Sequence, residues 1–194
     1  MDIVSEYFSK LNEGLNNLDK DKIKKIVEVI YNAWDNEKQI FILGNGGSAS
    51  TASHFACDIG KGTLGRNYND RKIKRFKVIS LTDNIATITA YGNDLSFDDI
   101  FSQQLNNLVC KDDVVIAITG SGNSINVIKA LEVAKQSEAI TIAFLGFDGG
   151  KVKDMVDHPL VFEDDHYGRV EDAHLILEHL ISQALCDMIK SKKQ

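Results

Sequence analysis

The spacing of apolar positions changes along the chain, and this change divides it into a helical beginning and an alternating remainder. Near the start, apolar side chains recur every three or four positions, which predicts two successive amphipathic helices. The members of the two stripes are Leu11, Leu15 and Leu18, then Ile23, Ile26, Val27, Ile30 and Trp34. Further on, short apolar runs rich in β-branched residues alternate with helix-like segments. The runs predict strands at 39–44, 76–81, 114–118, 140–145 and 159–162, and the segments predict helices at 48–59, 85–91, 98–108, 123–135 and 169–190.

This alternation of strands and helices predicts an α/β protein. Parallel strands joined by helical crossovers are covered on both faces, so we expect a doubly wound five-stranded parallel sheet preceded by an N-terminal helical hairpin. A length of 194 residues without linker or repeat suits a single domain over 1–194. The hairpin at 1–37 and the last helix carry more apolar surface than one small sheet can cover. We therefore expect these helices to pack against another copy of the chain.

Charge, hydropathy and cysteine content indicate which partners and which cellular compartment to expect. The net charge of −6 argues against general nucleic-acid binding. No apolar stretch approaches the roughly 18 to 20 residues that span a bilayer, and the acidic start of the chain is unlike a signal peptide. Cys57, Cys110 and Cys186 are odd in number and show no CxxC spacing, which indicates reduced thiols. We therefore expect a cytoplasmic protein with no nucleic-acid or membrane partner.

A glycine-rich loop follows the first predicted strand and leads directly into a helix. It reads Gly44-Asn-Gly-Gly-Ser48, and such a loop lets an anion approach free backbone amides at the positive end of the helix dipole. A nucleoside triphosphate loop would need the lysine of GxxxxGK[ST], which is absent here. The spacing Gly44-x-Gly46-x-x-Ala49 matches a dinucleotide loop, but the nearest acid at a strand end, Asp83, lies nearly twice too far along the chain. A site for a phosphate monoester is the third interpretation.

A second loop at a strand end favours the phosphate monoester. The run Thr119-Gly-Ser-Gly-Asn-Ser124 follows the third predicted strand and opens another helix. Its hydroxyl groups and backbone amides can surround a phosphate without any cation, because hydrogen bonds to a charged acceptor are strong. Two ordinary glycine turns with capping serines are the alternative interpretation of both loops.

Acidic and basic side chains gather on two of the predicted helices. His54 and Asp58 are four positions apart just after the first loop, so they lie on the same helix face. Glu171, His174 and His179 lie along the final helix. Histidine and carboxylate side chains serve as general acids and bases and as metal ligands. The side chains on these two helices are therefore candidates for acid–base or metal chemistry.

Four motifs of the chain together resemble the sugar-isomerase (SIS) domain family and, among its branches, the phosphoheptose isomerases. The motifs are Gly44-Asn-Gly-Gly-Ser48, Ala90-Tyr-Gly-Asn-Asp94, Thr119-Gly-Ser-Gly-Asn-Ser124 and Gly146-Phe-Asp-Gly-Gly150. The resemblance implies a flavodoxin-like five-stranded sheet, a homotetramer assembled through a helical bundle, and active sites shared between subunits. It also implies an aldose–ketose isomerase that interconverts sedoheptulose 7-phosphate and D-glycero-D-manno-heptose 7-phosphate through an enediol(ate).

The same resemblance implies roles for individual residues. Asp58 falls on the family's catalytic base, and His179 falls on its second catalytic histidine. The implied substrate-binding residues come from both loops, from the second motif and from the final helix: Asn45, Gly46, Gly47, Ser48, Asp94, Thr119, Gly120, Ser121, Ser124 and Glu171. Among these, the hydroxyl-bearing residues would hold the phosphate, and Asn45 and Asp94 would meet the sugar hydroxyls.

This chain departs from the family pattern at several positions. Asp58 is one methylene shorter than the family's glutamate, and Glu171 replaces a glutamine. Gly120 stands where heptose isomerases typically carry a threonine, and Gly62 stands where they carry an arginine. Some members bind zinc, and two histidines with two carboxylates suit zinc and similar metals. We therefore expect a divalent metal, with zinc as the first choice, bound by His54, Asp58, Glu171 and His179.

Because Asp58 is shorter than the family's glutamate, a second function is the alternative interpretation. A non-catalytic SIS module that binds a sugar phosphate and a protein partner would arise by loss of the base. The isomerase predicts turnover of a phosphorylated ketose, whereas the module predicts binding of the same sugar phosphate without turnover.

Overall fold

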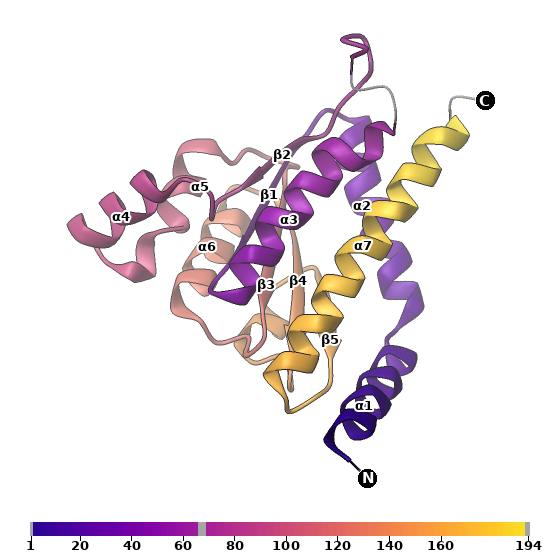
Figure 1. Cartoon of the computed structure of the whole chain (residues 1–194). Helices are drawn as coiled ribbons and strands as arrows, with labels where there is room; N and C mark the ends of the chain where they lie inside the picture. Colours follow the sequence, from indigo (N-terminus) through magenta and orange to yellow (C-terminus); the bar gives the residue numbers. More distant parts are fainter. Residues whose placement is uncertain (1, 66–68, 193–194) are drawn as a thin grey trace.

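Five parallel strands form the centre of the structure, a computed structural model that describes residues 2–65 and 69–192. The strands are β1 (Gln39–Gly44), β2 (Lys77–Ser80), β3 (Val114–Thr119), β4 (Ile140–Gly146) and β5 (His158–Phe162). Within the sheet they follow the order β2-β1-β3-β4-β5 (Figure 1). This is the strand order of flavodoxin-like doubly wound folds, so the predicted five-stranded parallel sheet is confirmed.

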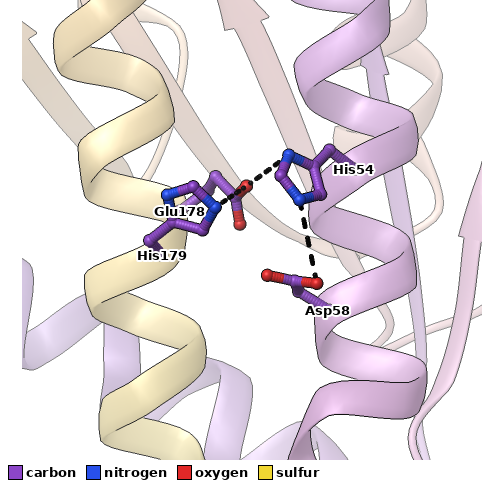
Figure 2. A group of neighbouring side chains, drawn as sticks. All are labelled: His54, Asp58, Glu178 and His179. Atoms are coloured by element: carbon purple, nitrogen blue, oxygen red, sulfur yellow. Dashed lines mark ion pairs between the residues drawn. The ribbon is translucent and has the colours of Figure 1, made fainter.

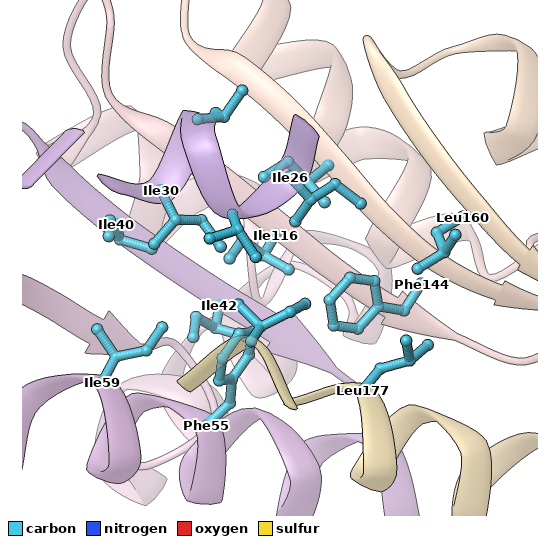
Figure 3. Packing of buried hydrophobic residues seen from close by; sticks show 14 of the residues in the cluster. Ile26, Ile30, Ile40, Ile42, Phe55, Ile59, Ile116, Phe144, Leu160 and Leu177 are labelled. Carbon is cyan, nitrogen blue, oxygen red and sulfur yellow. The ribbon is translucent and has the colours of Figure 1, made fainter. Parts of the chain in front are cut away.

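Helices cover both faces of the sheet. On one face lie α2 (Lys20–Asp35), α3 (Gly47–Lys61) and α7 (Tyr167–Lys192), and on the other lie α5 (Ser102–Leu108) and α6 (Ile125–Gln136). Successive residues of a strand point to opposite faces, so Ile40 and Ile42 of β1 join the first layer while Phe41 and Leu43 join the second. Figure 3 shows the first layer, in which side chains of α2, α3 and α7 meet those of the sheet.

The two helices predicted at the N-terminus are confirmed as α1 (Ile3–Asn17) and α2, joined through Leu18 and Asp19. The Asp2 and Asp19 carboxylates cap them by accepting backbone N–H groups of the first turns. Both helices contact α7, and the Tyr7 hydroxyl donates to Asp172 at 2.7 Å. No residue of α1 is buried, so its outer face is free to pack against another molecule.

The segment after β2 departs from the layered arrangement. α4 (Ile85–Asp94) has no buried residue, and Figure 1 shows it projecting far from α7. The helix predicted at 98–108 is divided into a 3-10 turn, η2 (Phe97–Asp99), and α5. Lys129 of α6 donates to Asp99 at 2.8 Å and holds this turn against α6, while Ser96 donates to Asp99 at 2.5 Å within the turn. Two further 3-10 turns are η1 (Gly62–Leu64) and η3 (Lys151–Asp154).

The two glycine-rich loops emerge at the same edge of the sheet. β1 and β3 are parallel neighbours, and Gly44 lies opposite Ile118, so the segments after these strands leave side by side. α3 starts in the first loop and packs along α7. This arrangement brings the two loops, α3 and α7 together. Among the described residues, no helix has both the length and the apolar character required to cross a membrane.

Candidate active site

The loop after β1 leaves the first turn of α3 open to a ligand. Gly46 is the N-cap residue with a φ of 57°, a left-handed conformation that glycine adopts without strain. No side chain caps the helix, so backbone N–H groups of the first turn and the positive end of the dipole face the space in front of the loop. Ser48 lies buried in this turn. This geometry suits an anion.

The loop after β3 has the same character. Thr119 is buried at the end of the strand, and Ser124 is the N-cap residue of α6 without using its hydroxyl as a cap. The loop is held from behind by the segment after β4, because the Val152 N–H donates to the Gly122 carbonyl at 3.1 Å. A side chain at position 122 would lie 2.0 Å from the carbonyl oxygen of Gly149, so only glycine fits there. These contacts fix the backbone of the loop and therefore the positions of its hydroxyl groups.

A pair of asparagines ties the first loop to α6. Asn45 and Asn126 exchange two side-chain hydrogen bonds of 2.9 Å each. Asn45 was expected to meet sugar hydroxyls, and here its amide positions the first loop relative to the second. Asn126 is buried and was missed in the sequence, where its position two residues after Ser124 was the available signal.

Four side chains from α3 and α7 form one compact group (Figure 2). His54 and Asp58 come from α3, and Glu178 and His179 come from α7. Each offers one ligand atom, and these atoms all lie within 4.8 Å of one another. Glu178 Oε1 is 3.1 Å from His54 Nδ1 and 3.4 Å from His179 Nε2, and Asp58 Oδ1 is 3.9 Å from His54 Nε2.

Glu178 is the unusual member of this group. Its side chain is 0% exposed, and among the described residues neither carboxylate oxygen has a partner in hydrogen-bond geometry. Burial, together with the nearby charge of Asp58, raises the pKa of Glu178 to about 8. A buried carboxylate without hydrogen bonds is costly. Binding of a cation by this group would offset that cost.

The group fits a divalent cation. Ligand atoms around a tetrahedral zinc at about 2.1 Å are separated by about 3.4 Å. Two separations observed here lie near that value: Glu178 Oε1 is 3.1 Å from His54 Nδ1 and 3.4 Å from His179 Nε2. Two imidazoles with two carboxylates are a donor set typical of zinc, manganese, iron or nickel. The unpartnered oxygens of Glu178 would gain a ligand by binding such an ion.

The structure places two other predicted residues away from this group. Glu171 was expected among the metal ligands, but Glu178 stands in the group instead. The Glu171 carboxylate covers Gly47, since a Cβ there would lie 2.6 Å from Oε2, so this acid lies at the phosphate-loop end. Asp94 is exposed at the end of α4, where Asn93 donates to it at 2.9 Å. Figure 1 shows α4 well apart from α7.

His174 of α7 belongs to the core rather than to the group. It is 1% exposed, and its ring lies 6.3 Å from that of Phe144. Burial lowers the pKa of His174 to about 4, so the imidazole is neutral near pH 7.

Comparison with known proteins links these features to one family. The model of the SIS domain matches residues 6–146. A phosphoheptose isomerase of Helicobacter pylori is 38% identical over 185 residues, which cover 95% of this chain and 89% of that protein. The structure of phosphoheptose isomerase from Neisseria gonorrhoeae superposes with a TM-score of 0.82 at 30% identity and covers 94% of both chains. That of a phosphoheptose isomerase from Francisella tularensis gives a TM-score of 0.85 at 27% identity over 95% of this chain and 94% of the other.

Proposed function

The chain belongs to the SIS domain family and, within it, to the phosphoheptose isomerases, and on this basis we propose that it is an aldose–ketose isomerase of phosphorylated sugars. Its proposed reaction converts sedoheptulose 7-phosphate into D-glycero-D-manno-heptose 7-phosphate. The observation that carries the proposal is the meeting of two hydroxyl-bearing loops with a group of histidines and carboxylates on α3 and α7.

The loops form the phosphate end of the proposed site. The hydroxyls of Ser48, Thr119, Ser121 and Ser124 would donate to the phosphate together with backbone N–H groups of Gly46 and Gly47. Gly47 and His54 are seven residues apart on α3, which is about 10 Å along the helix axis. An extended sugar of six or seven carbons has about this length from its phosphate to its first two carbons. The reacting carbons would therefore lie beside the His54 group.

In the proposed mechanism, the Asp58 carboxylate removes a proton from C1 of the ketose. The C–H electron pair forms the C1–C2 double bond, and the N–H of the His179 imidazole donates its proton to the C2 oxygen, which gives an enediol. The same nitrogen of His179 then accepts the proton of the C1 hydroxyl as the C1 carbonyl forms. Protonated Asp58 returns its proton to C2, which completes the aldose.

We propose that the same group binds a divalent cation, with zinc as the expected metal. Its ligands would be His54, Asp58, Glu178 and His179. When bound, the cation would supply positive charge that stabilises the negative charge developing on the substrate during proton transfer. The side chains of Asp58 and His179 are 33% and 50% exposed, whereas Glu178 is 0% exposed. The two proposed proton-transfer residues would thus face the sugar, with Glu178 behind them.

Turnover separates this proposal from a non-catalytic module. We expect purified protein supplied with zinc to convert sedoheptulose 7-phosphate into an aldose, followed by a coupled assay or by NMR. Removal of metal with a chelator should lower the rate, and added zinc should restore it. Ligand-dependent thermal stabilisation without turnover of any ketose phosphate of five to seven carbons would support the module that binds a sugar phosphate and a protein partner.

We also propose a homotetramer whose sites are shared between subunits, with the helices at 1–37 in the interface. Exposed apolar side chains on α1 support it: Ile3, Val4 and Phe8 are 76%, 59% and 66% exposed. In this arrangement Asp94 would reach the site of another subunit.

Light scattering of the wild type should give the mass of four chains. Phe8→Glu places a charge on the exposed apolar face of α1 and should lower the measured mass. A monomeric wild type would contradict the proposal. The cytoplasmic location stays a prediction.

A further inference from the structure

An aromatic ring lies directly over the second glycine-rich loop. The Cβ of any residue at position 120 would lie 3.0 Å from Cε1 and 3.3 Å from Cδ1 of Tyr167. Tyr167 also contacts Phe147, with ring centroids 4.8 Å apart at 66°. The main chain beneath the ring is fixed, because the Gly146 N–H donates to the Gly120 carbonyl at 2.9 Å. Gly120 is therefore the residue that makes room for Tyr167.

Tyr167 lies on the face of α7 that supplies the rest of the site. Residues four and seven apart on a helix share a face. Tyr167, Glu171 and Glu178 follow this spacing. Along that face, Tyr167 meets Gly120, Glu171 meets Gly47 and Glu178 meets His54. Yet Tyr167 is 57% exposed, so much of its side chain remains free to touch a ligand.

We propose that Tyr167 is a specificity-determining residue whose ring forms a wall of the sugar-phosphate pocket next to the second loop. The ring would contact the carbons of the sugar nearest the phosphate, while the loop hydroxyls bind the phosphate itself. Gly120 and Tyr167 then act as a pair, since a side chain at position 120 would displace the ring. This inference rests on the proposed function, because it assigns Tyr167 to the same pocket.

The test compares Tyr167→Ala, Tyr167→Phe, Gly120→Ala and the double variant Gly120→Ala/Tyr167→Ala. A wall that binds substrate and transition state equally changes KM and not kcat. We expect Tyr167→Ala to raise the KM for sedoheptulose 7-phosphate about three- to tenfold with kcat unchanged, and Tyr167→Phe to match the wild type. Gly120→Ala should raise KM because its methyl group would lie 3.0 Å from the ring. The double variant should have a KM no higher than Tyr167→Ala alone.

Two further measurements separate this inference from a structural role and from the proposed function. Tyr167→Ala should bind inorganic phosphate as tightly as the wild type, and Ile176→Ala, which removes a 39% exposed side chain elsewhere on α7, should leave KM unchanged. A wild-type KM in Tyr167→Ala, or additive effects in the double variant, would overturn the inference while turnover by the wild type still upholds the isomerase. If the wild type neither binds nor converts sugar phosphates, the proposed function itself fails.

Discussion

Replacement of Glu178 with leucine is expected to stabilise the metal-free protein by about 1 to 3 kcal/mol at pH 8 and to weaken its binding of zinc at least tenfold. The carboxylate is 0% exposed and has no partner in hydrogen-bond geometry among the described residues. Leucine fills a similar volume without a charge that must be desolvated. Chemical denaturation in the presence of a chelator measures the first effect, and zinc titration measures the second.

The stability gained by Glu178→Leu should depend on pH, which an effect of packing alone would not. The pKa of Glu178 is raised from 4.5 to about 8 by burial, so between these values the folded protein holds a proton that the unfolded chain has released. Stability contributed by this group is therefore lost as pH rises from about 4.5 to about 8, by at most about 1.4 kcal/mol per pH unit. The stability of Glu178→Leu relative to the wild type should thus be greatest at pH 8 and should differ little below pH 4.5.

Two controls accompany the leucine variant. Glu178→Gln removes the titration but leaves a buried amide, so it should flatten the pH dependence with a smaller gain in stability. Glu132→Leu removes an exposed acid of α6 and should leave the pH dependence as in the wild type. If Glu178→Leu destabilised the metal-free protein at pH 8 and kept the wild-type slope, the carboxylate would have a partner that the structure does not account for.

The fold could be predicted because each of its signals is local. Continuous apolar runs such as Val114–Thr119 are buried on both faces in a parallel sheet, and the glycines at the ends of β1 and β3 mark where the chain turns into α3 and α6. The pairing of His54 with Asp58 followed from helix geometry alone. In these cases a short stretch of sequence determines the structure that it adopts.

The composition of the four-residue group could not be predicted in the same way. Glu171 and His179 are eight residues apart on one helix, which is about 12 Å along the axis, so the contact each one makes depends on how α7 lies against α3. In the structure Glu171 reaches the loop at Gly47, and Glu178, one residue before His179, reaches His54. Helical spacing places Glu171 and Glu178 on one face of α7, but the packing of α7 against α3 determines which of the two contacts His54.

Substitution of Asp58 by asparagine is expected to lower kcat about 10²- to 10⁴-fold, the usual contribution of a general base. The amide keeps the size of the side chain and its place beside His54, 3.9 Å away, but it cannot accept the C1 proton. Asp58→Glu restores a carboxylate on a longer arm. Because proton transfer is sensitive to displacements of about 1 Å, we expect its rate to lie between those of Asp58→Asn and the wild type.

The measurement must separate loss of a base from loss of a metal ligand. We therefore expect Asp58→Asn, assayed at saturating zinc with the bound metal counted, to remain slow when the site is loaded. Its affinity for inorganic phosphate should be unchanged, because position 58 lies eleven residues after Gly47, about 16 Å along α3 from the first loop. Asp187→Asn, an exposed acid near the end of α7, is the matched control and should retain the wild-type rate. Wild-type turnover by Asp58→Asn with zinc bound at every site would show that another residue is the base. Recovery of the rate in proportion to bound zinc would show that Asp58 serves only to bind the metal.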